Sequence, residues 1–424
     1  MLIGENNPPF HFYFMHFWVK LFGIEPLWVR LPSVIFSALS AALIFKTGER
    51  FLNFTAGVAA SLVFTFSTMH IYFSHEARVY PLLVLLTVSS LLCFLNLVKT
   101  PSSKKYFILL FLSNLTLIYS HYFGFFVLFA QAVSLAVVPD KKETAKTLFL
   151  VFALLALCFI PMFSILFHRY TASSTSTWVL RPEWGEIYGN LNRFINGKYN
   201  TIAFLTVFVC VSVLGIKSLK GKTISFLKKD AVKILLVWFL VPYAAMFFIS
   251  FKIPMFIDRY ILFTSLPFFL LIAFALLHFV SNIRLAAAAS AIFIISMVIT
   301  VNLNPDNNRR IKDAVECVKK IKKENTIVLI CPNYSNLGFA YYYNKNYFRD
   351  YANLEKHLLD EKIYAVNEAD NIPELTAEND VIYFRADSRF QDPDNKIESA
   401  LLSLYPKNKT QTFFEIYHIH HFSR

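Results

Sequence analysis

The chain has 424 residues, of which 56% are hydrophobic and only 16% are charged, and its mean hydropathy is +0.48. Soluble domains carry about 25% charged residues, so the composition indicates a polytopic membrane protein and excludes an ordinary soluble enzyme. The net charge is +13, but the basic residues cluster in short links between apolar segments, as topology signals do. Membrane lipids are therefore the expected surroundings, and nucleic acid is not expected as a partner.

Apolar segments of spanning length follow one another along most of the chain. A spanning helix needs about 20 apolar residues, and the candidate spans are 28–46, 55–73, 80–98, 105–120, 122–139, 147–168, 201–216, 233–250, 259–279 and 285–302. A shorter apolar segment at 8–23 is interrupted by His11, His16 and Lys20. That length predicts a helix lying in the membrane interface rather than a span.

Lysine and arginine recur at every second junction between these spans. The basic links, which we place in the cytoplasm, are 46–53, 99–105, 140–146, 217–233 and 281–284. The opposite links then face outward: 74–79, 120–124, 169–200 and 251–258, together with the chain after 303. The first 27 residues also fall outside. Because an external start without a preceding span has no obvious route across the membrane, we expect an upstream segment with one more span.

The pattern changes after residue 303. Helical segments alternate with short apolar strands, such as "TIVLIC" (326–331), "DVIYFRAD" (380–387) and "TFFEIYHIHHF" (412–422). This alternation predicts a small extracytoplasmic α/β domain at 303–424, after a juxtamembrane segment at 1–27 and a transmembrane domain at 28–302. The histidines of "HIHH" (418–421) are read as a polar strand face rather than a metal site.

The outward link "FSHEARVYP" (73–81) places a carboxylate, Glu76, and a guanidinium, Arg78, between two apolar spans. Ionisable residues at the edge of the hydrocarbon are costly and are functional hypotheses by default. The link is too short to leave the membrane surface, so both side chains are expected to face a shared cavity. A structural salt bridge is the alternative, and the same two interpretations apply to Asp258 and Arg259.

An outward cavity that holds arginines, a carboxylate and aromatic rings suits an anionic, phosphate-linked substrate, because arginine can bind phosphate with two hydrogen bonds. Lys20 and Arg30, taken singly, are also explained as side chains that reach the headgroups. His121 in "YSHYFG" is, taken alone, best explained as a turn histidine with its hydrogen bonds satisfied.

Five motifs carry a resemblance to a known family. They are "NPPF" (7–10), "RLPS" (30–33), "FSHEARVY" (73–80), "SHYFG" (120–124) and "DRYILFTSLPFFLLIA" (258–273). In order and spacing they resemble the multi-spanning GT-C glycosyltransferases, in the branch of the protein O-mannosyltransferases and the aminoarabinose transferases of lipid A. The resemblance covers roughly residues 5–280.

This resemblance implies a GT-C fold: about ten transmembrane helices, an interfacial helix and a C-terminal extracytoplasmic domain. It implies inverting transfer of a sugar from a polyprenyl phosphate to a lipid, glycan or protein acceptor. The reaction would take place on the periplasmic face of a bacterial inner membrane. Glu76 would be the catalytic carboxylate, near the donor phosphate or as ligand of a divalent cation, if one participates. The substrate-binding residues would be Arg78, Arg259 and Lys20, which neutralise the leaving phosphate, with His75, Tyr80, His121, Tyr122, Tyr260 and Arg30.

One departure from the family pattern leaves alternatives open. The family has an Asp ahead of the Pro-Pro motif, and this chain begins at that motif, with Asn7 before the prolines. A non-catalytic protein that binds lipid phosphosugar is one alternative, and a flippase or transporter is another, although no internal repeat is seen. In the link 169–200, Trp178 and Trp184 are candidates to stack on sugars or to act as interfacial anchors.

Overall fold

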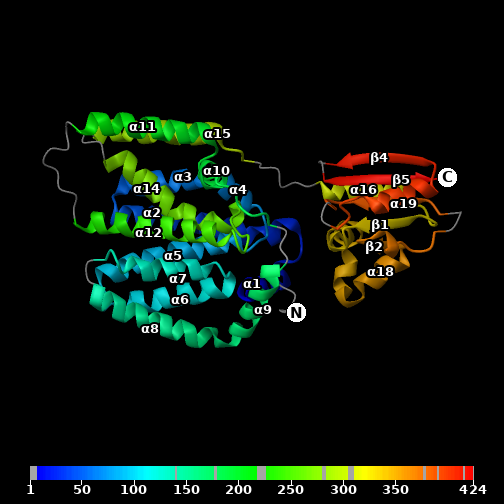
Figure 1. Cartoon of the computed structure of the whole chain (residues 1–424), viewed down its shortest axis with the longest axis horizontal. Helices are drawn as coiled ribbons and strands as arrows, with labels where there is room; N and C mark the ends of the chain where they lie inside the picture. The colour runs from blue at the N-terminus through cyan, green and yellow to red at the C-terminus, as the bar shows by residue number, and fades with distance from the viewer. Residues whose placement is uncertain are drawn as a thin grey trace. The chain divides into compact units, whose positions relative to one another are not determined.

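The computed structural model describes residues 7–138, 141–175, 179–216, 226–278, 283–303, 310–375, 379–388, 391–413 and 416–423. The chain divides into two compact units, Met1–Pro305 and Asp306–Arg424. The first is helical, and the second is a sheet with helices (Figure 1).

The helical unit consists of long helices that lie side by side, with the short helices α1, α4 and α10 gathered at one end of them (Figure 1). Its α-helices are α1 (Phe10–Phe22), α2 (Pro26–Phe51), α3 (Phe54–Thr65), α4 (Thr68–Ser74), α5 (Tyr80–Lys99), α6 (Lys104–Ser120), α7 (Gly124–Ser134), α8 (Lys141–Phe159), α9 (Phe163–Thr175), α10 (Gly185–Phe194), α11 (Lys198–Ile216), α12 (Phe226–Ile249), α13 (Asp258–Ile261), α14 (Ser265–His278) and α15 (Ile283–Thr300). A helix α1 is present where the interfacial helix was predicted. With 13 residues it is too short to span a bilayer.

The prediction of an all-α membrane unit is confirmed, with corrections to individual spans. By length and composition, the described helices able to cross a membrane are Pro26–Phe51, Tyr80–Lys99, Lys141–His168, Lys229–Ile249 and Asp258–Leu277, and the bent pair α3–α4 makes a sixth. The prediction of 55–73 as one helix is wrong, because α3 and α4 meet at 63°. Helix α7 has 11 residues and is shorter than the predicted 122–139. The predicted link 169–200 contains a helix of its own, α10.

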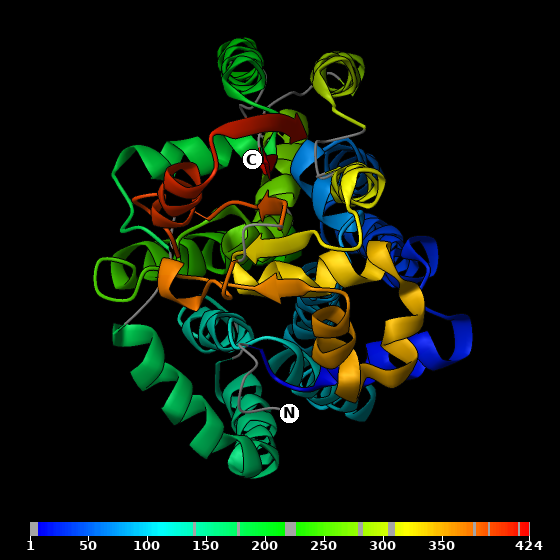
Figure 2. The ribbon, with the colours of Figure 1, turned by 90° about the vertical axis from the view of Figure 1, so that its right-hand side faces the viewer.

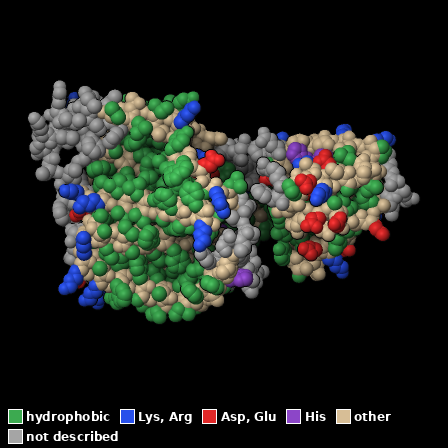
Figure 3. All heavy atoms as spheres, in the orientation of Figure 1, with side chains coloured by type: hydrophobic (Ala, Val, Ile, Leu, Met, Phe, Trp, Pro, Cys, Tyr) green, Lys and Arg blue, Asp and Glu red, His purple; other side chains and the backbone are tan. Residues whose placement is uncertain are grey.

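The surface of the helical unit matches a lipid environment. Apolar side chains form a broad area across its middle, and lysines and arginines gather mainly at the end opposite to α1 and α10 (Figure 3). Large apolar residues in this surface include Phe149 and Leu157, which are 71% and 63% exposed. A patch of this extent on a soluble monomer would be unusual, whereas lipid tails solvate it.

Helices α2 and α3 form a tight hairpin because two glycines meet in it. A Cβ atom built on Gly48 would lie 2.6 Å from the Cα of Gly57, and one built on Gly57 would lie 2.5 Å from the carbonyl oxygen of Phe45. Small residues let the backbones of membrane helices approach closely, so that dispersion contacts are maximised. The side chain of Asn53 caps α3 by accepting a hydrogen bond of 2.8 Å from the N–H of Ala56.

A closed polar triangle joins α5, α6 and α7 inside the unit. Ser90 donates to Asn114 Oδ1 at 2.7 Å, Asn114 Nδ2 donates to Gln131 Oε1 at 2.9 Å, and Gln131 Nε2 donates to Ser90 Oγ at 2.7 Å. All three side chains are fully buried. Buried polar groups that satisfy one another hold helices in one register, and this network explains polar residues within apolar spans without a ligand.

The second unit has the expected α/β architecture. Its strands β1 (Ile327–Cys331), β2 (Ile363–Ala365), β3 (Val381–Arg385), β4 (Lys407–Phe413) and β5 (Tyr417–Ser423) lie in the order β2-β1-β3-β5-β4. The first three are parallel, and β5 is antiparallel to β3 and to β4. The prediction of one strand over 412–422 is wrong, because the segment forms parts of two antiparallel strands.

Helices cover both faces of this sheet, which Figure 2 shows nearly edge-on between them. Val328 and Ile330 pack on one face with α16 (Ile311–Ile321), α17 (Asn336–Tyr343) and α18 (Leu354–Asp360). Leu329 packs on the other face with α19 (Lys396–Leu404). Strands covered on both sides read as continuous apolar runs, which is why "TIVLIC" was recognisable as a strand.

The C-terminal histidines have protein partners in this sheet. His420 is buried, with Nδ1 3.0 Å from Thr410 Oγ1 and 3.4 Å from Glu398 Oε1. His418 Nδ1 lies 3.1 Å from Thr412 Oγ1. These contacts agree with their interpretation as a polar strand face.

Candidate functional site

The break between α3 and α4 is tied to the turn that joins α10 to α11. Asn196 Oδ1 accepts from the N–H of Thr68 at 2.7 Å, and Asn196 Nδ2 donates to the carbonyl of Phe66 at 2.8 Å. Ser67 donates to the carbonyl of Phe194 at 2.9 Å. Backbone groups exposed by a helix break within a membrane need partners, and these side chains supply them. The turn thereby fixes the direction of α4 and of the link that follows it.

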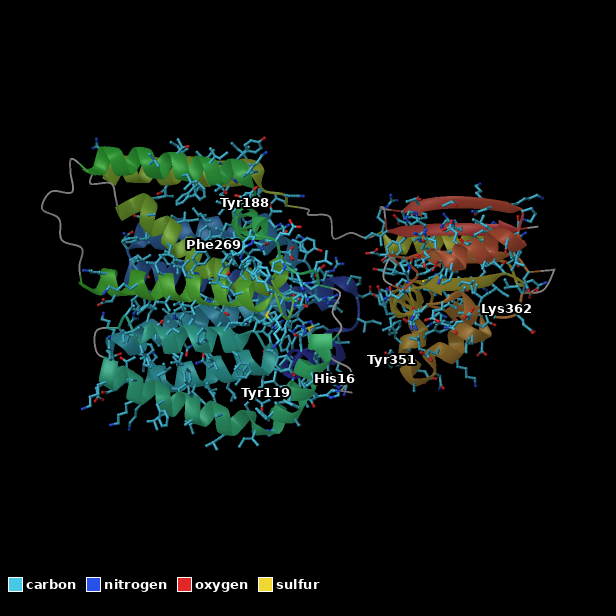
Figure 4. The ribbon with its side chains drawn as sticks, in the orientation of Figure 1. His16, Tyr119, Tyr188, Phe269, Tyr351 and Lys362 are labelled. Carbon is cyan, nitrogen blue, oxygen red and sulfur yellow. The ribbon has the colours of Figure 1, made fainter. Side chains whose placement is uncertain are left out.

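A buried histidine anchors the other side of α4. His70 Nε2 lies 2.8 Å from Ser265 Oγ, whose own proton is donated to the carbonyl of Leu262 at 2.7 Å. The serine therefore accepts, and the proton of the neutral imidazole is on Nε2. The ring of His70 packs 5.7 Å from that of Phe269, which lies among the helices in Figure 4. His70 is a structural connection between α4 and α14.

Glu76 and Arg78 lie in the short link between α4 and α5. The N–H of Glu76 donates to the carbonyl of Phe73 at 3.2 Å, and the N–H of Arg78 donates to the carbonyl of Glu76 at 2.8 Å. Glu76 is half-buried and Arg78 is exposed. Within the described ranges, neither side chain has a hydrogen-bond or ion-pair partner, so the alternative of a Glu76–Arg78 salt bridge is wrong.

Aromatic rings from three separate parts of the chain meet next to this link. Tyr80, at the start of α5, lies 6.0 Å from His121 and 6.3 Å from Tyr260, measured between ring centroids. His121 and Tyr260 are 6.2 Å apart, and the guanidinium carbon of Arg259 lies 5.5 Å from the centre of the Tyr260 ring. We call Tyr80, His121, Arg259 and Tyr260 the ring cluster. The fold thus brings together residues predicted from three different motifs.

His121 is a neutral member of the ring cluster. Its Nδ1 accepts a hydrogen bond of 3.2 Å from the N–H of Phe123, so the ring proton is on Nε2. Burial lowers the pKa of His121 to about 3, because the charged imidazolium would be desolvated. The imidazole can therefore donate one hydrogen bond to a ligand but carries no charge near neutral pH.

Charged groups lie next to the ring cluster. Glu76 and Arg78 precede Tyr80 in the link between α4 and α5, and the guanidinium group of Arg259 lies over the ring of Tyr260. Two guanidinium groups and one carboxylate beside a hydroxyl can bind a phosphate and still keep one group able to accept a proton. The cluster lies where the link after α4, the turn at 121–123 and the start of α13 meet.

The other predicted substrate-binding residues fall into two groups, one close in sequence to the ring cluster and one in α1 and α2. His75 ends α4 and is half-buried, and Tyr122 packs at the edge of the apolar core. Lys20 in the last turn of α1 and Arg30 in α2 are exposed. In the part of the chain that the structure describes, no contact joins Lys20 or Arg30 to the ring cluster.

Among the described residues, no group of three or more His, Cys, Asp or Glu side chains is placed to hold a metal ion, around Glu76 or elsewhere. Glu76 alone would leave a divalent cation to take its other ligands from phosphate and water, as magnesium often does. The chemistry proposed below uses only groups of the chain.

The Asn196 contacts give a first testable prediction. Asn196 has φ 64°, so Asn196→Gly keeps the left-handed backbone and removes only the side-chain hydrogen bonds. We expect a loss of about 1–3 kcal/mol in stability, because the backbone groups at Thr68 and Phe66 lose their partners. Thermal unfolding of the purified protein in detergent measures it. Asn395→Gly is the control, since Asn395 has φ 51° and no side-chain hydrogen bond within the described residues. Equal melting of both variants would contradict the role of Asn196.

Comparisons with known proteins identify a family model and solved structures that are similar to this chain. Residues 6–166 match the family model described as dolichyl-phosphate-mannose-protein mannosyltransferase. Among curated proteins no relative matches. Two solved structures of ArnT from Cupriavidus metallidurans are similar in fold. The apo form aligns with a TM-score of 0.56 and 11% identity, over 98% of this chain and 87% of that one. The form bound to undecaprenyl phosphate aligns with a TM-score of 0.52 and 12% identity, over 98% and 88%.

The chain has the GT-C fold. The resemblance is confirmed over residues 6–166, where the chain is mannosyltransferase-like, and the implied fold is confirmed by the ArnT structures. The chain is an integral membrane protein. In this GT-C protein, two of the motifs within the matched range each contribute one residue to the ring cluster, namely Tyr80 and His121. The other two members, Arg259 and Tyr260, lie outside the matched range.

Several residues that shape the site were missed by sequence reasoning. Asn196 stands before Gly197, an Asn-Gly pair typical of a turn, but nothing in the sequence connects that turn to α4. His70 reads as one polar residue in an apolar run. Two tryptophans of the link 169–200 were candidates to stack on sugars. Trp178 lies outside the described residues, whereas the ring of Trp184 lies 5.3 Å from that of Phe247 and the residue is 67% exposed.

Proposed function

We propose that this protein is a membrane glycosyltransferase that moves a sugar from a polyprenyl phosphate to a hydroxylated acceptor. The observation that carries the proposal is the meeting of Tyr80, His121, Arg259 and Tyr260 beside the link that contains Glu76 and Arg78, at one end of a GT-C helical unit. The family model and the undecaprenyl phosphate held by the ArnT structure support a polyprenyl-linked donor. The site faces the periplasm of a bacterial inner membrane in this proposal, since the basic links lie at the opposite end.

The arrangement supports an inverting displacement. An acceptor oxygen forms a bond to the anomeric carbon while the bond from that carbon to the phosphate oxygen breaks. The polyprenyl phosphate leaves with the electron pair of the broken bond, and Arg78 and Arg259 stabilise its growing negative charge. The carboxylate of Glu76 takes the proton of the acceptor hydroxyl. The neutral His121 donates from Nε2 to a phosphate or sugar oxygen.

A reconstituted assay tests the proposal. The full chain is placed in liposomes with undecaprenyl phosphate mannose labelled in the sugar, and bacterial envelope lipids and glycans are supplied as acceptors. We expect label in an acceptor together with an equal amount of free undecaprenyl phosphate. Movement of intact labelled lipid across the bilayer without release of the phosphate would instead establish a flippase. Binding of the lipid without either event would establish a non-catalytic binding protein.

A further inference from the structure

A cavity of about 460 Å³, with both apolar and polar walls, lies beside the ring cluster. Its walls come from α4, from the end of α10 and the turn that follows it, from the start of α13 and from the end of α15. We call it the Asp258 cavity, and the residues that define it are Tyr72, Phe73, Asn192, Arg193, Asp258 and Thr300. Its volume falls in the range of about 300–1,000 Å³ that small-molecule sites occupy.

Two elements connect the Asp258 cavity to the ring cluster. Phe73 lines the cavity, and its ring lies 5.3 Å from that of Tyr80. Asp258 lines the cavity, and the next residue, Arg259, stacks on Tyr260. A molecule bound in the cavity would therefore lie next to the donor site but separate from the phosphate-binding guanidinium group of Arg259. This is the position that an acceptor must occupy.

The carboxylate of Asp258 is held in place by its own helix. Its Oδ1 accepts a hydrogen bond of 2.7 Å from the N–H of Arg259, which fixes the side chain at the first turn of α13. The side chain is half-buried, and the described residues provide no partner for Oδ2. A carboxylate fixed by one oxygen presents the other as an acceptor for a ligand hydroxyl.

The other walls match a hydroxyl-rich ligand. The Asn192 amide nitrogen and the Arg193 guanidinium are donors in the cavity wall, and the Asp258 carboxylate is an acceptor. The amide oxygen of Asn192 already accepts from Thr201, and the hydroxyl of Thr300 is already bonded to Asn200 and Ser296. Tyr72 and Phe73 add ring surfaces for the apolar C–H face of a sugar. Planar polar groups that bind neighbouring hydroxyls, combined with aromatic surface, are suited to a pyranose. Arg193 already contacts Asn190 at 3.0 Å and Glu186 at 3.6 Å. Because the carboxylate of Glu186 offsets its charge, the cavity does not favour a strongly charged anion.

We propose that the Asp258 cavity binds the acceptor as a carbohydrate, with Asp258 holding acceptor hydroxyl groups, a proposal that rests on the function proposed above. The acceptor class is thus a glycan or a glycolipid headgroup rather than a peptide. Asp258 acts as a binding residue, and the proton of the reaction still passes to Glu76.

Ligand-observed NMR on the full chain in nanodiscs tests this proposal. The probe is methyl α-mannopyranoside, and the comparison ligands are inorganic phosphate and a serine- and threonine-rich peptide. We expect the pyranoside to bind to the wild type and its affinity to fall about tenfold or more in Asp258→Asn, because a hydrogen bond to a charged group is lost. This variant keeps an oxygen for the N–H of Arg259, so the first turn of α13 is preserved. Arg193→Met should weaken binding as well.

Glu183→Gln is the matched control, since Glu183 is an exposed carboxylate on the same side of the helical unit and does not line the cavity. Absence of pyranoside binding, equal binding in Asp258→Asn, or displacement by phosphate or by the peptide would each overturn the proposal. Undecaprenyl phosphate binding is measured in the same samples by a thermal shift. If the pyranoside binds and the lipid does not, the proposed function fails and the assignment of the cavity as a carbohydrate site stands. If the lipid binds and the pyranoside does not, the cavity assignment fails and the proposed function stands.

Discussion

Glu76→Gln is expected to lower the rate of sugar transfer about 10²–10⁴-fold, because the amide can no longer take the proton of the acceptor. Arg78→Ala is expected to lower it about 10²–10³-fold, since one of the groups that stabilise the leaving phosphate is removed. Neither change should impair folding, as neither side chain has a partner among the described residues. Transfer from labelled undecaprenyl phosphate mannose, measured in liposomes with equal amounts of protein, gives both rates.

The control for Glu76→Gln is Glu49→Gln, which removes a carboxylate from the opposite end of the helical unit. Glu49 is paired with Lys46 at 2.7 Å on an exposed surface, where such pairs contribute little. Its transfer rate should equal that of the wild type. Wild-type rates in Glu76→Gln would exclude Glu76 from the reaction, and a lower melting temperature in that variant would show a structural role instead.

Gly48→Ala and Gly57→Ala are expected to destabilise the helical unit by about 1–3 kcal/mol each, the usual effect of overpacking. The added Cβ atoms would meet backbone atoms, at 2.6 Å and 2.5 Å, and backbone cannot rotate out of the way. Helices α2 and α3 would have to separate. Thermal unfolding in detergent measures the loss.

Gly185→Ala is the matched control for the glycine pair. A Cβ on Gly185 would meet nothing within 4 Å, and alanine favours the helix in which this residue lies. We expect unchanged or slightly higher stability. Equal melting temperatures for Gly48→Ala and Gly185→Ala would show that the α2–α3 contact is not tightly packed.

The parts of the fold that were predictable are those that depend on local patterns. Spans such as 80–98 were found because lipid requires a long apolar run whatever its neighbours are. The strand at 326–331 was recognisable because a strand covered on both faces is apolar throughout. The break at Phe66 and Ser67 was not predictable, because no proline or glycine marks it and its partners come from Asn196 and Phe194, far along the chain.

The candidate site divides in the same way. Motifs and charge in an apolar context identified Glu76, Arg78, Tyr80, His121 and Tyr260. Their meeting was expected only from the family resemblance, because contacts between residues 80, 121 and 260 leave no periodic signal. The Asp258 cavity was not anticipated at all, because its walls combine ordinary polar residues, such as Asn192 and Thr300, with aromatic ones from separate elements.

The sequence by itself determined the membrane environment and the main apolar helices, and it predicted the directions of the spans and the charged residues at the outward end. Those properties follow from the solvation of each segment, which acts on that segment alone. Only the tertiary structure decided that α3 and α4 bend, that three motifs converge on the ring cluster and that Asp258 faces a cavity. Those properties depend on which distant segments pack together, and packing is decided by the shape and hydrogen-bonding partners of the whole bundle.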